Sequence, residues 1–274
     1  MRPMGTGRIF RGKTVVITGG AGGLGRAFGH RFAQAGARVA LLDLNGKGVE
    51  EQAAQWGAEG VECIGIACDV TREPACRGAL ATVMDRFGGV DVLINNAGIT
   101  HRSAFADTRP GVFQQVMNVN FFGALYCTQA ALPSLMERDG LIIVISSVAG
   151  FAPLLGRSGY AASKHALHGL FETLRTELQK TGVDVMMVCP GYTATNISIS
   201  ALDGDGTITK HPQSRVGKMA RPAEVADAVF LGAEKGRRIM VLTPTGVIAR
   251  YLCRIWPALY DRLMIRSLGG ELER

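Results

Sequence analysis

The sequence lacks the marks of a secreted, disulfide-bonded or membrane-spanning protein. Its six cysteines form no C-x-x-C pair and several lie in apolar runs, which favours buried thiols in a reducing compartment over a disulfide framework or zinc site. The first apolar run begins at Thr14, which leaves no room before it for the apolar core of a signal peptide. A charge-free stretch, residues 111–136, carries five Asn and Gln side chains and is too polar to span a bilayer. We therefore expect a cytoplasmic protein without a metal site.

Internal repeats and low-complexity linkers are also missing. Apolar residues make up 47% of the chain and charged residues 19%, which predicts a folded globular protein rather than a disordered one. A nucleic-acid partner would need basic residues clustered with aromatics along a groove, and only the C-terminal region is noticeably basic, so we expect no nucleic-acid partner. Glycine is abundant, with 36 of 274 residues. Because it follows no G-x-y period, its excess predicts tight turns and close backbone contacts.

Short apolar runs rich in β-branched residues alternate with longer segments of helical spacing. The runs cover residues 14–18, 39–43, 61–68, 90–95, 141–146, 183–189 and 239–243. This alternation predicts an α/β fold: a doubly wound, Rossmann-like parallel sheet with helices on both faces. We expect one nucleotide-binding domain over residues 1–246, with a helical substrate lid at 196–219, and a C-terminal amphipathic extension over residues 247–274.

A glycine-rich turn follows the first predicted strand and leads directly into a predicted helix. Glycines at this place let the backbone approach a pyrophosphate at the helix N-terminus, although a turn that only closes the strand is the alternative. The register is ambiguous. Gly20, Gly22 and Gly25 fit G-x-G-x-x-G, whereas T-G-x-x-x-G-x-G is formed by Thr18, Gly19, Gly23 and Gly25.

Asp43 ends the second predicted strand, 18 residues after Gly25. An acid at about this distance binds the ribose 2′-hydroxyl of NAD and repels the 2′-phosphate of NADP. A helix-capping aspartate is the alternative. Because Arg38 lies at the other end of the strand, it offers no partner for a phosphate. The pattern favours NAD.

Tyr160 and Lys164 lie four residues apart in a predicted helix, so their side chains share one face. A neighbouring ammonium stabilises a phenolate and lowers its pKa, which suits a tyrosine to general acid/base work. A surface pair without a function is the alternative when the spacing is taken alone.

The chain resembles the short-chain dehydrogenase/reductase family over roughly residues 8–243. The motifs match in order and spacing: Thr18-Gly19-x-x-x-Gly23-x-Gly25, Asp69, Asn95-Asn96-Ala97-Gly98, Asn120, Ser147 at 13 residues before Tyr160, Tyr160-x-x-x-Lys164 and Pro190-Gly191. The resemblance favours the second glycine register. It also implies a single-domain oxidoreductase.

The resemblance assigns catalytic roles to four residues. Tyr160 would be the general acid/base and Ser147 would hold the substrate oxygen. Lys164 would bind the nicotinamide ribose and lower the pKa of Tyr160. Asn120 would position a water in a proton relay, a role for which Asn118 is the competing choice.

The cofactor-binding residues expected from the same resemblance extend from the adenine to the nicotinamide. They are Thr18, Gly19, Gly23, Leu24, Gly25, Asp43, Asp69, Val70, Asn96, Ala97, Gly98, Tyr160, Lys164, Pro190, Gly191, Thr193 and Thr195. Thr193 replaces the Val or Ile more common in the family, but its backbone could still meet the nicotinamide carboxamide.

Three histidines offer weaker signals. His165 and His168 share a helix face, but no third metal ligand is evident nearby, which favours two helix-surface residues. His101 follows the Asn95 strand end, where ligands of α/β sheets bind, so it is either a substrate contact or a solvated loop residue.

Apolar side chains gather around the expected substrate pocket. They are Phe151, Pro153, Leu154, Leu155, Tyr192, Ile197, Ile199 and Leu202. They favour a hydrophobic alcohol or ketone, such as a steroid, retinoid or fatty-chain compound, although they could instead pack the lid against the core. We expect an NAD-dependent dehydrogenase; the rivals are an NADPH-dependent ketone or carrier-linked ketoacyl reductase and a catalytically silent NAD-binding partner protein.

The C-terminal region is basic and amphipathic. Residues 235–265 contain six basic residues against one Asp. A helical stripe of Leu252, Trp256, Leu259 and Leu263 lies opposite Arg250, Arg254, Arg262 and Arg266, and Pro257 predicts two short helices. The stripe could make weak peripheral contact with an anionic membrane or pack on the protein. The family resemblance also implies a homo-oligomer, paired through the helices that contain Asn120 and Tyr160.

Overall fold

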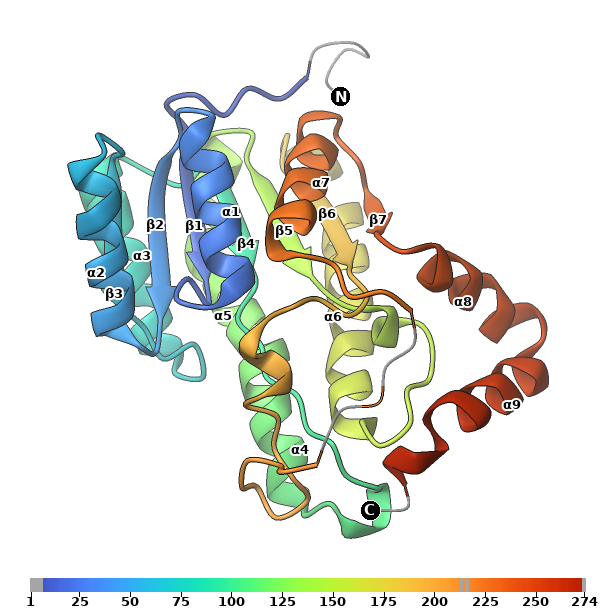
Figure 1. Cartoon of the computed structure of the whole chain (residues 1–274). Helices are drawn as coiled ribbons and strands as arrows, with labels where there is room; N and C mark the ends of the chain where they lie inside the picture. The colour runs from blue at the N-terminus through green and yellow to red at the C-terminus, as the bar shows by residue number, and fades with distance from the viewer. Residues whose placement is uncertain (1–6, 212–213, 215–216, 273–274) are drawn as a thin grey trace.

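A computed structural model describes residues 7–211, 214 and 217–272. The predicted domain, lid and extension also include residues 1–6, 212–213, 215–216 and 273–274, which lie outside the described residues. The chain folds as an α/β protein around one seven-stranded parallel sheet of order β3-β2-β1-β4-β5-β6-β7 (Figure 1). Its strands are β1 (Thr14–Thr18), β2 (Arg38–Asp43), β3 (Cys63–Ala67), β4 (Val92–Asn95), β5 (Leu141–Ile145), β6 (Asp184–Cys189) and β7 (Ile239–Val241). The predicted doubly wound sheet is confirmed.

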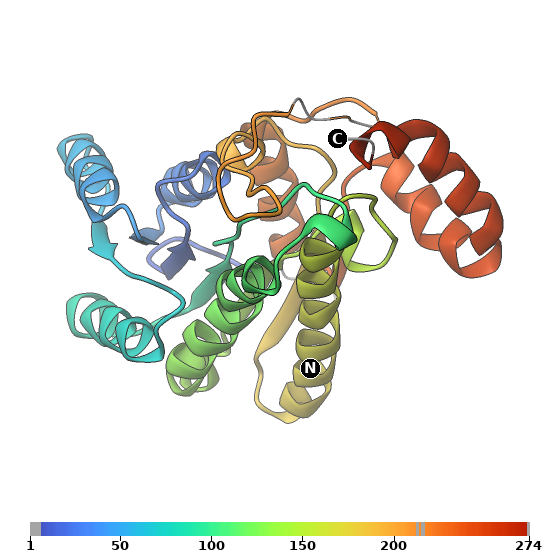
Figure 2. The same ribbon diagram turned by 90° about the horizontal axis from the view of Figure 1, so that it is seen from below.

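Two layers of helices cover the sheet (Figure 2). One layer is α1 (Gly23–Gln34), α2 (Gly46–Ala58) and α7 (Pro222–Glu234), and the other is α3 (Glu73–Phe87), α5 (Gly123–Glu137) and α6 (Ser158–Glu177). Neighbouring residues of a strand point to opposite layers, so Val15 and Ile17 pack with the first layer and Val16 with the second. Because both faces are covered, β1 is wholly buried. This explains the continuous apolar runs of the sequence.

The strand order reverses at β1, which pairs with β2 on one side and β4 on the other. The connections from these two strands diverge to opposite faces of the sheet, which opens a crevice at the carboxyl ends of the strands. The glycine-rich turn after β1 and the residues after β4 meet at this crevice. The short helix α4 (Pro110–Met117) and a π-helical turn (Asn118–Phe122) lead from there into α5.

The lid differs from its sequence prediction. Its described residues contain one short helical turn, the 3-10 turn Asn196–Ser198, and are otherwise irregular. Leu202 forms a parallel bridge with His101 and an antiparallel bridge with Ile208. Between Leu202 and Ile208, Gly206 adopts a φ of 91° and Asp205 accepts a hydrogen bond from the main-chain N–H of Thr207 at 2.8 Å. Turn chemistry therefore makes a hairpin-like loop where we expected a helix.

Two helices that contact each other follow the last strand: α8 (Pro244–Ile255) and α9 (Pro257–Leu268). They project from the body of the molecule at the end of the chain (Figure 1). Pro257 stands in the first turn of α9, as predicted, while α8 begins at Pro244, three residues before the predicted start of the extension at residue 247. Among the described residues, no helix is both long enough and apolar enough to cross a membrane.

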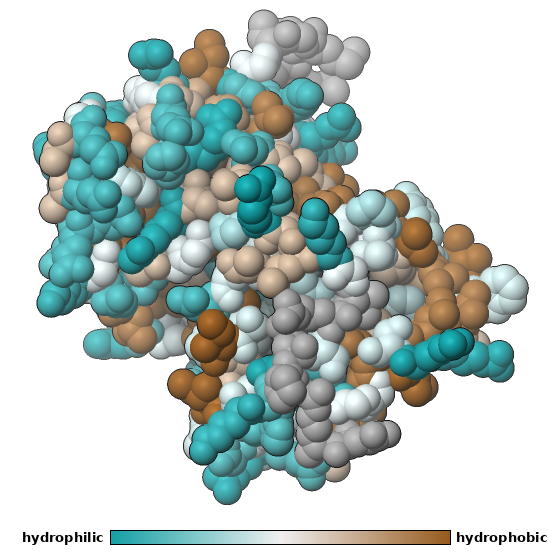
Figure 3. All heavy atoms as spheres, viewed as in Figure 1, coloured by the Kyte–Doolittle hydropathy of each residue, from teal (hydrophilic) through white to brown (hydrophobic). Residues whose placement is uncertain are grey.

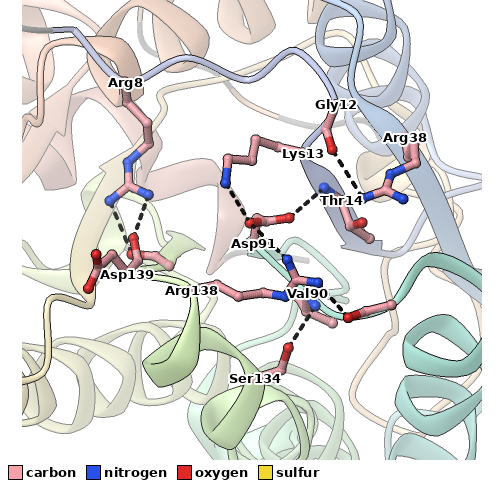
Figure 4. Close-up of polar contacts among 12 residues, drawn as sticks. Arg8, Gly12, Lys13, Thr14, Arg38, Val90, Asp91, Ser134, Arg138 and Asp139 are labelled. Atoms are coloured by element: carbon pink, nitrogen blue, oxygen red, sulfur yellow. Dashed lines mark hydrogen bonds and ion pairs between the residues drawn. The ribbon is translucent and has the colours of Figure 1, made fainter.

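Asp91 anchors the opposite end of the sheet, where the strands begin (Figure 4). Its carboxylate is 3% exposed. It accepts hydrogen bonds from Lys13 Nζ at 3.0 Å and from the main-chain N–H of Thr14 at 2.9 Å. Nearby, Ser134 of α5 accepts a hydrogen bond from the main-chain N–H of Val90. These contacts tie β1, β4 and α5 together far from the crevice.

Candidate active site

A continuous cavity of about 1110 Å³ opens at the carboxyl ends of the strands. Its walls come from the glycine-rich turn, the ends of β2, β4 and β5, helix α6, the segment after β6, the lid and the two C-terminal helices. Most residues expected at the site line it. They are Gly19, Gly23, Leu24, Asp43, Asp69, Val70, Asn96, Ala97, Gly98, Ser147, Tyr160, Lys164, Pro190, Gly191, Thr193 and Thr195.

The glycine-rich turn forms a cradle that side chains would fill. Gly19 has a φ of 67°, and a Cβ there would lie 2.9 Å from the Cα of Ala97. A Cβ at Gly25 would overlap the carbonyl oxygen of Gly19. At Gly23 it would extend into the cavity, 3.3 Å from Cγ2 of Thr195. The first turn of α1 thus faces open space with its backbone amides, an arrangement that fits a pyrophosphate.

Thr18 and Gly25 shape this cradle from behind and do not line the cavity. Thr18 Oγ1 accepts hydrogen bonds from the main-chain N–H groups of Asn96 and Ala97, both at 3.0 Å. The Asn96 side-chain amide returns a hydrogen bond to the carbonyl of Thr18 at 2.9 Å. The threonine of the motif therefore holds the turns after β1 and β4 together, and its hydroxyl is engaged in these hydrogen bonds.

Asp43 lies beside the cradle, at the end of β2. Its carboxylate accepts hydrogen bonds from the main-chain N–H groups of Ala21 at 3.0 Å and Asn45 at 2.9 Å. Asn45, not Asp43, caps helix α2 through its side chain, so the helix-capping alternative for Asp43 does not hold. Among the described residues that line the cavity, Arg157 and Lys164 are the basic ones, and both lie at the other end.

Ser147, Tyr160 and Lys164 converge at the end of β5. Ser147 begins the turn after the strand and accepts a hydrogen bond from the main-chain N–H of Ala149 at 3.1 Å. Tyr160 and Lys164 share one face of α6, as their spacing predicts. Lys164 is 4% exposed and donates a hydrogen bond from Nζ to the carbonyl of Ile145 at 2.9 Å.

The electrostatics of Tyr160 differ from the sequence argument. Burial raises the pKa of its hydroxyl, while a hydrogen bond with Ser147 and the charge of Arg157 act to lower it. The sequence argument assigns this lowering to Lys164, whose own pKa burial lowers to about 8. Arg157 was missed in the sequence. Its side chain is 5% exposed, and its guanidinium carbon lies 6.0 Å from the centre of the Tyr192 ring.

Asn120 lies in the π-helical turn and is 1% exposed. Its side-chain oxygen accepts a hydrogen bond from the main-chain N–H of Ile99 at 2.8 Å, and its amide donates to the carbonyl of Ile99 and to Ser163 Oγ. Asn120 therefore stands behind the cavity wall. Asn118, the competing choice, does line the cavity, but its oxygen accepts a hydrogen bond from Gln114 on the same helical segment.

The histidines have structural contacts. His101 is fully buried, which contradicts both a solvated loop residue and a residue lining the cavity. Its Nε2 accepts a hydrogen bond from the main-chain N–H of Gly159 at 2.9 Å, beside Tyr160. His168 contacts Glu172 at 3.0 Å, with its other nitrogen 3.6 Å from Cys189 Sγ, so it is not a plain surface residue. The described residues contain no group of three metal-ligating side chains.

The substrate end of the cavity has an apolar lining that only partly matches the expected set. Of that set, the residues lining it are Pro153, Leu154, Tyr192 and Ile197, whereas Phe151, Leu155, Ile199 and Leu202 lie elsewhere. The missed part comes from α8 and α9, which add Ile248, Ala249, Leu252, Leu263, Met264 and Leu268. The apolar stripe of the C-terminal region was the sequence signal for this lining. Its spacing indicates an amphipathic helix but not the surface against which the helix packs.

Comparisons with known proteins agree with this geometry. The family model of short chain dehydrogenases matches residues 13–205. Dehydrogenase/reductase SDR family member 7B of Bos taurus is 37% identical over 270 residues, which cover 95% of this chain and 83% of the relative. The same protein of Danio rerio is also 37% identical, over 92% of this chain and 84% of its own length.

Solved structures give the same result for the fold. A short-chain dehydrogenase/reductase of Burkholderia phymatum in complex with NAD superimposes with a TM-score of 0.82 at 25% identity, covering 92% of this chain and 96% of that one. An alcohol dehydrogenase of Thermococcus sibiricus complexed with 5-hydroxy-NADP has a TM-score of 0.71 at 27% identity, covering 84% and 94%. With this fold and these sequence matches, the chain belongs to the short-chain dehydrogenase/reductase family.

Proposed function

We propose that the protein is an NAD-dependent oxidoreductase acting on a hydrophobic secondary alcohol or its ketone. The observation that carries this proposal is the meeting of two features in one cavity. A glycine cradle with Asp43 occupies one end, and Ser147, Tyr160 and Lys164 converge at the other. When bound, the cofactor supplies or accepts the hydride.

The residues of the chain then have distinct tasks. In oxidation the phenolate of Tyr160 would take the proton from the substrate hydroxyl, and in reduction the Tyr160 hydroxyl would give its proton to the carbonyl oxygen. Ser147, already hydrogen-bonded to Tyr160, holds that same substrate oxygen. Lys164 would bind the nicotinamide ribose through its ammonium, and this charge, 5.6 Å from the centre of the Tyr160 ring, would favour the phenolate form. Asn120, whose side chain is held by the backbone of Ile99, would position a water of the proton relay.

The preference for NAD rests on Asp43. Its backbone contacts hold the carboxylate at the adenosine end, where it would accept hydrogen bonds from a ribose diol. A 2′-phosphate there would meet this negative charge and none of the basic side chains described in the lining. This argues against an NADPH-dependent ketone or carrier-linked reductase. The convergence of Ser147, Tyr160 and Lys164 argues against a catalytically silent binding protein.

A hydrophobic substrate suits the walls beyond Tyr160. The lid contributes Ile197, and α8 and α9 contribute Leu252 and Leu263. Such walls favour a steroid, retinoid or fatty-chain compound over a small polar alcohol. A screen of NAD-linked oxidation over short, long-chain and steroid secondary alcohols tests the proposal. We expect turnover that increases with the apolar size of the alcohol; turnover limited to small polar alcohols, or faster with NADP, would contradict it.

Pairing of subunits through α5 and α6 is part of the same proposal. The two helices lie side by side on one face of the molecule (Figure 2). Small residues of α6, Ala162 and Gly169, are exposed, and a Cβ at Gly169 would contact nothing. They leave room for a second helix. Light scattering should give a multiple of the 29.1 kDa chain mass, and a mass of one chain would contradict pairing. The cytoplasmic location stays a prediction.

A further inference from the structure

The two C-terminal helices carry large apolar side chains that point away from the protein. We call the following set the outer apolar face: Val247, Ile248, Tyr251, Ile255, Trp256, Leu263 and Ile265. Every member is at least 42% exposed, and Ile255 reaches 79% and Trp256 64%. In Figure 3, brown apolar spheres gather at the right-hand edge over α8 and α9. Single exposed apolar residues are ordinary, but a cluster of this kind marks an interaction surface.

The outer apolar face is continuous with the mouth of the cavity. Ile248 and Leu263 belong to both, because they line the cavity and are nevertheless 62% and 48% exposed. Deeper positions of the same helices, Leu252 and Leu268, lie inside the cavity wall. An apolar molecule could therefore pass from this face into the cavity along a continuous set of apolar side chains.

Positively charged side chains border this face. Arg250 and Arg254 follow α8 on one side of its apolar stripe, and α9 adds Arg262 and Arg266. Residues 244–272 contain two acids, and one of them, Glu271, is buried at 6% exposure. The charge is complementary to anionic lipid headgroups, and Trp256 and Tyr251 are residue types that favour the headgroup level. Apolar side chains bordered by arginines are typical of helices that lie in a membrane interface.

We propose that the outer apolar face docks on an anionic lipid surface and that the cavity mouth opens toward the lipid. A second copy of this chain fits the face less well, since two-fold pairing would bring the arginines of both copies together. Such pairing would also cover Ile248 and Leu263 at the mouth. Docking itself is independent of the proposed function, whereas substrate entry from the lipid rests on it.

Co-sedimentation with vesicles tests the docking without any need for turnover. The full chain is mixed with vesicles of phosphatidylserine and phosphatidylcholine, or of phosphatidylcholine alone, at low and high salt. The test variant is Ile255→Ser with Trp256→Ser, because neither residue lines the cavity. Leu231→Ser is the matched control, since Leu231 is 47% exposed on α7, outside this face.

We expect wild type and control to sediment with the anionic vesicles at low salt and to be released by high salt. The double variant should bind at least ~tenfold more weakly. Equal sedimentation of the double variant, or none by a folded wild-type chain, would overturn the docking. So would a wild-type oligomer that the double variant dissociates, because the face would then be a subunit interface.

Substrate entry has its own readout. Oxidation of a long-chain alcohol dissolved in the vesicles is compared with oxidation of a water-soluble alcohol that the enzyme accepts. The double variant should raise KM for the vesicle-borne alcohol and leave kinetics with the soluble alcohol unchanged. Equal effects on both alcohols would overturn entry from the lipid. Vesicle binding without turnover of either alcohol would contradict the proposed function while leaving the docking intact.

Discussion

The ammonium of Lys164 lies 5.6 Å from the centre of the Tyr160 ring, one helical turn away on α6. Both groups are withdrawn from solvent, so burial raises the pKa of Tyr160 and lowers that of Lys164 to about 8. Each shift favours the neutral form of its group. A ligand that stabilises the charged ammonium would therefore change the protonation of this pair when it binds.

Binding of NADH should be linked to proton uptake by Lys164. Near and above pH 8, part of the buried amine is neutral, and ribose hydroxyls together with the cofactor's phosphates favour its charged form. Calorimetry of NADH binding in buffers of different ionisation enthalpy measures this uptake. Lys164→Met should abolish it and weaken binding. The same proton uptake in wild type and Lys164→Met would show that another group titrates.

Asp43 should set the cofactor preference. Asp43→Ala is expected to weaken NAD binding by ~10- to 100-fold, because hydrogen bonds to a charged group contribute ~1.5–3 kcal/mol. Asp43→Asn keeps an acceptor for the Ala21 amide and removes the charge that repels a 2′-phosphate. The ratio of NAD affinity to NADP affinity should therefore decrease, and the fold should be preserved. Fluorescence titrations provide the affinities, with exposed Asp85→Asn as the control; an unchanged ratio in Asp43→Asn would refute the assignment.

His101 should make the stability depend on pH. Burial, and then the charge of Arg157, lowers its pKa from 6.5 to about 4. The folded protein thus keeps His101 neutral, while the unfolded chain takes up a proton below pH 6.5. The free energy of unfolding should fall as the pH drops from 6.5 toward 4, by up to ~3 kcal/mol from this group.

Urea unfolding across this pH window measures the effect. His101→Gln offers an acceptor to the Gly159 amide but cannot titrate, so its stability should fall less steeply with pH. His165→Gln is the control, because His165 is exposed on α6. The same slope in wild type and His101→Gln would rule His101 out as the titrating group.

Asp91 should contribute to stability without affecting the site. Asp91→Ala removes the acceptor of the buried Thr14 amide, which costs ~1–3 kcal/mol, whereas Lys13 can turn to water. Asp91→Asn retains one acceptor and should lose less. Chemical denaturation gives both values. Cofactor affinity should stay unchanged, since this cluster lies where β1 and β4 begin, at the other end of the strands from the crevice; a large loss of affinity would show that the two ends are coupled.

The predictable features were local ones. Strand runs such as Thr14–Thr18, the glycine turn and the spacing of Tyr160 and Lys164 each depend on neighbours in sequence, and the structure has them as expected. The prediction of a helical lid was wrong because an Asp-Gly turn interrupts the segment after its apolar first residues. His101 and Arg157 were misjudged or missed because their burial depends on segments distant in sequence. For the same reason, the lining supplied by α8 and α9 required the tertiary structure.

Turnover by Tyr160→Phe tests the central claim most directly. The substitution keeps the ring and removes the proton-carrying oxygen, while Lys164 and the glycine cradle remain to bind the cofactor. Formation of NADH is measured with a hydrophobic secondary alcohol that the wild type oxidises, and NAD binding is measured separately, with exposed Tyr251→Phe as the control. We predict that kcat falls by ~10²- to 10⁴-fold with little change in NAD affinity. Turnover within ~threefold of wild type, far less than general acid/base catalysis contributes, would contradict the account.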